Sequence, residues 1–97
     1  MAVAIRMAFD GMNLDDYDGV CEALNLPADW PDGLLAHGST DVDGNLLVTD
    51  VWESRDKYDS FVESRLQSAI GETLGDRARP PEVTERQLHT FQARAVG

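Results

Sequence analysis

The chain has 97 residues, which is enough for a single domain (residues 1–97) with one modest core but not for two. Its 18 acidic residues against 8 Lys and Arg give a net charge of −10, which disfavours nucleic acid and anionic membrane surfaces as partners. Cys21 is the only cysteine, which excludes an internal disulfide and a cysteine-based zinc cluster. No apolar run approaches the roughly 20 residues of a membrane span and the N-terminus lacks a signal-peptide layout, so we expect a cytoplasmic protein.

The first third of the sequence predicts a strand, a helix and a loop. Large apolar residues alternate with smaller or polar ones over residues 2–9, the period of a strand with one packed face. Asn13 is suited to cap a helix, and apolar residues recur at helical spacing from there to Pro27. The loop of residues 27–33 then crosses back over the sheet, and we expect its Trp30 to plug one end of the core.

Residues 34–53 predict a β-hairpin. Two strand patterns, residues 34–42 and 45–53, flank Asp43-Gly44, a dipeptide that tolerates the positive φ angles of a tight two-residue turn.

The second strand of this hairpin runs directly into a helix. Ser54 can accept hydrogen bonds from the first backbone N–H groups of that helix, and Asp56 lies in its first turn, where the helix dipole favours a negative charge. We expect the helix to run from about Arg55 to Gly71. Its predicted buried stripe comprises Tyr58, Phe61, Val62, Leu66, Ala69 and Ile70.

The order of elements predicts an α+β fold of the ferredoxin-like type, βαββαβ. A linker of residues 75–81 leads to the last strand, residues 83–92, and residues 93–97 should fray. Two right-handed crossovers place both helices on one face of a four-stranded antiparallel sheet. The other face would be bare, so we expect a homodimer that covers it.

The hairpin register predicts a candidate general base beside a carboxylate. With a two-residue turn, His37 faces Asp50 and Leu35 faces Trp52. A carboxylate raises the basicity of an imidazole and fixes its tautomer, which gives a base for the proton of a phenol or an enol. The alternative is a half-exposed cross-strand pair that only stabilises the sheet. A three-residue bulged turn would shift the register and separate the two residues.

Two further candidates are His89 and Tyr58. His89 on the last strand is a second candidate base, although a lone strand histidine is more often structural. His37, Asp50 and His89 nominally match a two-histidine, one-carboxylate metal site, but their strands need not meet within coordination distance, so we expect no metal. Tyr58 can point its hydroxyl toward a cavity, with plain core packing as the alternative.

Three stretches carry a resemblance to a known family. They are the strand-to-helix signature Val-Trp-Glu-Ser at residues 51–54 with Tyr58 and Phe61 after it, Pro-Asp-Gly-Leu-Leu at residues 31–35, and the closing strand with His89 and Phe91. Over nearly its whole length the chain resembles the dimeric α/β-barrel superfamily, and within it the antibiotic-biosynthesis-monooxygenase type of small domain. The resemblance implies that Trp52 lines a substrate pocket inside each subunit. We therefore expect a homodimer with a small, largely apolar pocket per subunit, lined by Trp52, His37 and Tyr58, and we expect Trp52, Tyr58 and Phe61 to bind the substrate.

Members of this superfamily include cofactor-independent oxygenases, heme-degrading enzymes and polyketide cyclases. The heme degraders carry an iron-ligating histidine on the second helix and an asparagine on the first strand; both are missing here, so we expect neither heme nor another cofactor. The resemblance implies a cofactor-independent monooxygenase or cyclase acting on an aromatic, polyketide-like substrate, with His37 or His89 as base. The alternative is a non-catalytic ligand-binding or regulatory dimer.

Overall fold

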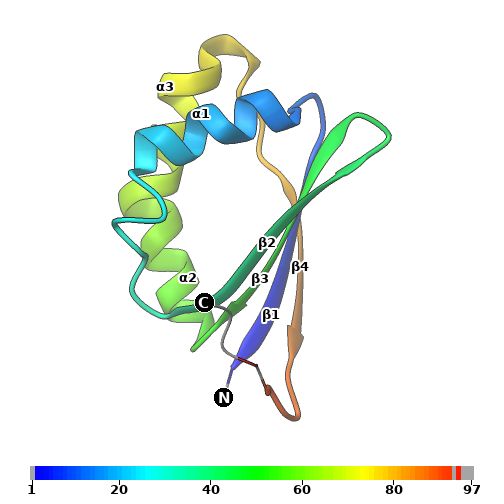
Figure 1. Cartoon of the computed structure of the whole chain (residues 1–97), viewed down its shortest axis with the longest axis vertical. Coiled ribbons are helices and arrows are strands. Elements are labelled where there is room, and N and C mark those ends of the chain that lie inside the picture. Colours follow the sequence, from blue (N-terminus) through cyan, green and yellow to red (C-terminus); the bar gives the residue numbers. More distant parts are fainter. Residues whose placement is uncertain (1, 93, 95–97) are drawn as a thin grey trace.

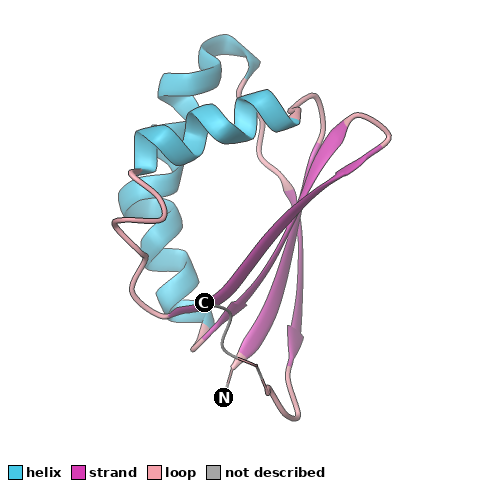
Figure 2. Ribbon diagram, viewed as in Figure 1, coloured by secondary structure: helices cyan, strands magenta, loops and turns pink. Residues whose placement is uncertain are grey.

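The structure, a computed structural model, describes residues 2–92 and 94 of the chain. Four strands form one antiparallel sheet in the order β2-β3-β1-β4 (Figure 1). They are β1 (Val3–Phe9), β2 (Leu34–Val42), β3 (Asn45–Trp52) and β4 (Glu82–Gln87). Helix α1 (Leu14–Leu24) and the segment from α2 (Arg55–Phe61) to α3 (Gln67–Leu74) cover one face of this sheet (Figure 2). The predicted ferredoxin-like βαββαβ fold is confirmed.

Local capping explains where both helical segments begin. The Asn13 side chain accepts from the Asp16 backbone N–H at 2.9 Å, and the Asp16 carboxylate accepts from the Asn13 N–H at 3.1 Å, which is a complete capping box. Ser54 Oγ accepts from the Lys57 N–H at 3.2 Å and starts α2. Both predicted caps are therefore confirmed.

The second helical segment is longer than predicted and is not uniform. It passes through a π-helical stretch at Val62–Leu66 and ends at Leu74 instead of Gly71. A glycine weakens a helix interior but does not have to end it, so the packing of Leu74 in the core carries the helix one turn further. The predicted buried stripe is confirmed, with Val62 only partly buried at its edge.

The hairpin has the predicted two-residue turn but departs from the predicted register at its open end. Asp43 and Gly44 adopt positive φ angles of 52° and 86°, and His37 pairs with Asp50. The expected pairing of Leu35 with Trp52 is wrong. A β-bulge between residues 34 and 36 puts Leu34 opposite Trp52 and leaves Leu35 42% exposed.

Strand β4 is shorter than predicted. It ends at Gln87, opposite Val3, where its neighbour β1 begins. Because β4 is an edge strand with β1 as its only partner, the ladder stops there, and the prediction of a strand to residue 92 is wrong. Of the tail expected to fray, residues 93 and 95–97 lie outside the described residues.

The core lies between the sheet and the helices. Ile5, Leu46 and Trp52 are among its fully buried side chains. Trp30, which we expected to plug one end of the core, is 47% exposed, so that prediction is wrong; the neighbouring Pro31 is buried instead. None of the helices in the described part of the chain is long and apolar enough to cross a membrane.

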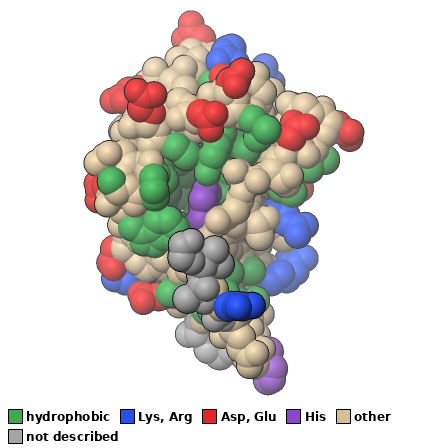
Figure 3. All heavy atoms as spheres, in the orientation of Figure 1, with side chains coloured by type: hydrophobic (Ala, Val, Ile, Leu, Met, Phe, Trp, Pro, Cys, Tyr) green, Lys and Arg blue, Asp and Glu red, His purple; other side chains and the backbone are tan. Residues whose placement is uncertain are grey.

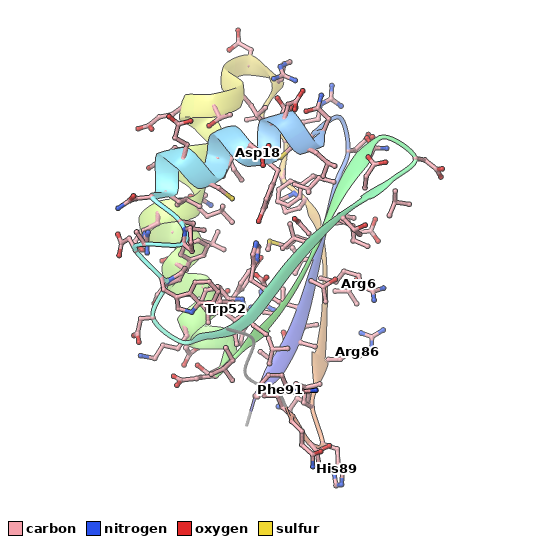
Figure 4. The ribbon with its side chains drawn as sticks, in the orientation of Figure 1. Arg6, Asp18, Trp52, Arg86, His89 and Phe91 are labelled. Atoms are coloured by element: carbon pink, nitrogen blue, oxygen red, sulfur yellow. The ribbon has the colours of Figure 1, made fainter. Side chains whose placement is uncertain are left out.

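The other face of the sheet has no cover within the described chain. Alternation along β1 turns Ala4, Arg6 and Ala8 to this side, away from the buried Ile5. Figure 4 shows Arg6 and Arg86 pointing away from the helices, one from β1 and the other from β4. The two faces are thus unlike. The inner face carries large apolar side chains, whereas small residues and cations, among them Ala4, Ala8, Arg6 and Arg86, lie on the outer face.

Candidate functional site

A chain of hydrogen bonds runs through His37 on the inner side of β2. Its Nδ1 lies 2.6 Å from Asp50 Oδ1, and its Nε2 lies 2.6 Å from the hydroxyl oxygen of Tyr17 on α1. The Tyr17 and His37 rings also stack, with centroids 5.9 Å apart and planes inclined by 16°. The pairing of His37 with Asp50 follows from the hairpin register, whereas the contact with Tyr17 depends on how α1 crosses the sheet.

Asp50 is the buried anchor of this chain. It is 3% exposed, and its second oxygen, Oδ2, accepts the indole N–H of Trp52 at 3.2 Å. Because an indole nitrogen can only donate, Oδ2 must be an acceptor. Both carboxylate oxygens thus have partners, which is what keeps a polar group at this depth compatible with a stable core.

A protonated Tyr17 is compatible with one set of hydrogen-bond directions along this chain. Burial raises the pKa of the Tyr17 hydroxyl to about 12, so the phenol keeps its proton at neutral pH and can donate it to His37 Nε2. His37 Nδ1 then carries the ring proton and donates to Asp50. In this arrangement Nε2 accepts a hydrogen bond, and the carboxylate on the far side of the ring orients the imidazole.

A small, partly enclosed cavity of about 40 Å³ lies against this chain, between the sheet and the helices. Asp50, His37 and Tyr17 form its polar side. The rest of the wall is apolar and comes from β1, β3 and all three helices. Among these residues are Met7, Phe9, Val20, Val48, Leu66 and Ile70.

An open groove of about 480 Å³ lies on the other side of Tyr17 and His37. It runs between α1 and the following loop, and its wall includes Asp18 and the exposed Trp30. Four residues line both the groove and the cavity and so lie between the two spaces: Tyr17, Cys21, Leu26 and His37. Figure 3 shows a hollow on this face, with hydrophobic side chains gathered around a histidine.

The structure brings together only part of the predicted site. His37 and Asp50 meet, and Phe61 lines the cavity. His89, by contrast, is exposed beyond the end of β4, and Figure 4 places it at the far end of the molecule from α1. Its predicted position on a strand is therefore wrong, since β4 loses its partner before reaching it.

Trp52 and Tyr58 lie elsewhere than expected. Trp52 is 0% exposed and is not among the residues that line the cavity. Its ring packs against Tyr58 and Phe61 at centroid distances of 5.8 and 5.4 Å, because the start of α2 closes over the end of β3. Tyr58 itself lines a separate groove beside residues 78–81, which has no histidine or carboxylate in its wall. Neither ring thus lines the cavity that His37 lines, and their role in substrate binding stays a prediction.

The sequence interpretation missed Tyr17 as a site residue. Its only signal was its place in the apolar stripe of the first helix, where a tyrosine brings a hydroxyl group into an otherwise apolar face. Within residues 2–92 and 94 there is no group of three or more His, Cys, Asp or Glu side chains that could hold a metal ion.

Comparisons with known proteins place the fold. No family model and no curated protein matches the sequence. Among solved structures, Rv0793 of Mycobacterium tuberculosis is similar with a TM-score of 0.64 and 20% identity, covering 96% of this chain and 100% of that one. A protein of Bordetella bronchiseptica, provisionally named an antibiotic biosynthesis monooxygenase, has a TM-score of 0.66 and 18% identity, covering 92% and 98%. NE2512 of Nitrosomonas europaea, of unknown function, has the same TM-score and identity, covering 97% and 93%.

At these identities the likeness concerns the fold. Several of the similar structures are provisionally named antibiotic biosynthesis monooxygenases, from organisms as distant as Chloroflexus aurantiacus and Deinococcus radiodurans. The chain therefore has the ferredoxin-like fold of the antibiotic-biosynthesis-monooxygenase type, and the resemblance found in its sequence is confirmed at that level.

Proposed function

We propose that the protein is a cofactor-independent monooxygenase in which His37 is the general base. The observation that carries this proposal is the hydrogen-bonded chain Tyr17–His37–Asp50 at the boundary between an open groove and an apolar cavity. The carboxylate orients the imidazole and stabilises the imidazolium that forms when Nε2 takes a proton. The fold shared with proteins provisionally named monooxygenases supports the reaction class.

The groove has a size suited to an aromatic, polyketide-like substrate. Its volume of about 480 Å³ lies in the range of about 300–1,000 Å³ that is usual for small-molecule sites, whereas the cavity is far below it. A ring bound in the groove could rest on the exposed face of Trp30 and reach His37 with its acidic end. The substrate would thus bind outside the core, with only its reacting carbon at the boundary.

The proposed reaction needs no reductant beyond the substrate. His37 Nε2 removes a proton from a CH₂ group made acidic by a neighbouring phenol or carbonyl, and the carbanion adds O₂ to give a peroxide. The peroxide takes up a proton and loses water as its O–O bond and the second C–H bond break, which leaves a C=O group. Overall CH₂ and O₂ become C=O and H₂O. For this step the Tyr17 hydroxyl, which stays protonated at neutral pH, turns from His37 Nε2 to the substrate oxygen. It donates a hydrogen bond there as negative charge develops, and Nε2 is free to take the substrate proton.

A homodimer is also part of the proposal. The outer face of the sheet is uncovered, and a second copy of the chain is the partner that its small residues would accommodate most closely. Sedimentation equilibrium should give twice the chain mass of 10.7 kDa. A monomer mass at all concentrations would show that this face has another role.

The experiment for the reaction is oxygen consumption by the purified protein in the presence of a chelator, with a panel of anthrone-type and phenolic substrates. His37→Ala should lower kcat by about 10²- to 10⁴-fold, the usual contribution of a general base. His89→Ala is the matched control, because it removes the other histidine from an exposed site. If His89→Ala lost activity and His37→Ala did not, His89 would be the base and the proposed site would be wrong.

The second candidate is a non-catalytic ligand-binding dimer. It is favoured by one observation: both ring nitrogens of His37 already have protein partners, as in a structural side chain. Calorimetric titration with the same panel separates the two functions. Stoichiometric binding without any oxygen consumption would favour the binding protein.

A further inference from the structure

We propose that the cavity beside His37 is a binding site for molecular oxygen. This inference rests on the proposed monooxygenase function and deepens it by assigning a place to the second substrate. The cavity has a volume of about 40 Å³ and touches both His37 and Asp50 from the core side.

The size of the cavity limits its occupant. In this measure one water molecule needs about 10–15 Å³, so the cavity holds a few small molecules, or a diatomic gas, but no aromatic ring. Its wall is mostly aliphatic and aromatic, with Phe9, Val20, Val48 and Ile70 among the contributors. Such a space favours a small apolar molecule.

The hydrogen bonds of the polar wall argue against water as the occupant. Tyr17, His37 and Asp50 lie in the wall, but their polar atoms are bonded to one another and to Trp52, and almost all of the surface that faces the cavity is apolar. A buried water usually needs two to four polar partners, and apolar cavities without them stay dry. Oxygen has no hydrogen bonds to lose and can enter.

The position of the cavity matches the order of the proposed reaction. The partition between the cavity and the groove consists of Tyr17, Cys21, Leu26 and His37. A carbon deprotonated by His37 Nε2 from the groove side would lie one side chain away from oxygen held on the core side. Oxygen stored there would have to pass only between these side chains, and not around the bound substrate, to meet the carbanion as it forms.

Xenon is the probe, because it is apolar and enters dry cavities of proteins. Methyl NMR signals of Val20, Val48 and Ile70 should shift saturably under xenon pressure, and dissolved oxygen should broaden the same signals by its paramagnetism. Val48→Ile adds one methylene group to the cavity wall and should abolish both effects. Val3→Ile is the matched control, since it adds the same group to a buried site that does not line the cavity. Val20→Ile repeats the test from α1 if Val48→Ile folds poorly.

Kinetics then link the cavity to turnover. Val48→Ile should raise the KM for oxygen at least about fivefold and leave the KM for the organic substrate unchanged, while Val3→Ile should change neither. Ordered water in the cavity, or no xenon effect, would overturn this inference and leave the proposed function intact. Xenon binding without oxygen consumption on any substrate would instead remove the proposed function and with it the role of the cavity in oxygen binding.

Discussion

The two tryptophans of the chain lie in opposite environments although each donates its indole N–H to a nearby oxygen. Trp52, at the end of β3, is fully buried under α2 and donates to the Asp50 carboxylate at 3.2 Å. Trp30, in the loop before β2, is half-exposed beside the groove and donates to the Leu34 carbonyl at 2.7 Å. Under the proposed function the two would have different roles: Trp52 would hold Asp50 from behind, and Trp30 would offer an aromatic surface to a ligand.

The largest expected effect is on stability. Trp52→Ala should cost about 3–5 kcal/mol of unfolding free energy, because it opens a large void in the core and leaves Asp50 without one partner. Trp30→Ala, the matched control, removes one hydrogen bond and should cost about 1 kcal/mol. Urea denaturation of both variants measures the difference. Equal costs for the two would mean that Trp52 is not a core residue.

Asp50→Asn tests the link between Trp52 and the base. The Asp50 carboxylate has one oxygen for His37 and one for Trp52, whereas the amide of Asn has a single acceptor oxygen and cannot accept from both. We therefore expect the free energy of unfolding to fall by about 1–3 kcal/mol. Nitrogen NMR of the imidazole should show a change in the His37 tautomer. Glu63→Gln on the exposed helix surface removes the same charge and should change stability by less than about 0.5 kcal/mol. An unchanged tautomer in Asp50→Asn would contradict the orienting role of this carboxylate.

For ligand affinity, in contrast to stability, we expect Trp30→Ala to have a larger effect than Trp52→Ala. An aromatic contact contributes about 0.5–1.5 kcal/mol, so Trp30→Ala should weaken the binding of an aromatic ligand about 2- to 10-fold. Calorimetric titration at a temperature where both variants are folded makes the comparison with Trp52→Ala. If Trp30→Ala bound the ligand as the parent does, the groove would lose its place as the binding site.

An alkaline titration tests the environment of Tyr17 in the same assembly. Burial raises the pKa of Tyr17 from 10.0 to about 12, and burial also raises the pKa of Tyr58. The folded state therefore keeps a proton on Tyr17 that the unfolded state has released, so stability should fall as the pH rises from about 10 toward 12. Tyrosinate absorbance of the parent, with Tyr17→Phe and Tyr58→Phe to assign each step, measures it. A normal titration near pH 10 would show that Tyr17 is not shielded by the helix and the sheet.

The sequence by itself determined the features that depend on neighbouring residues. The Asn13 and Ser54 caps, the Asp43-Gly44 turn and the helical stripe are set by local backbone chemistry and by periodicity, so they could be predicted. The two-residue turn in turn sets the pairing of His37 with Asp50, the histidine and carboxylate of the candidate site.

Only the tertiary structure decided the features that depend on contacts between distant segments. The bulge at residue 35 carries no local signal in the sequence, and the end of β4 is set by the length of β1. Whether Trp30 or Trp52 is buried depends on where α2 closes over the sheet. Tyr17 reaches His37 because the position at which α1 packs on the sheet brings Tyr17 over this part of β2. Periodicity tells which side of an element faces the core, but the partner that a side chain meets there is fixed by the packing of whole elements.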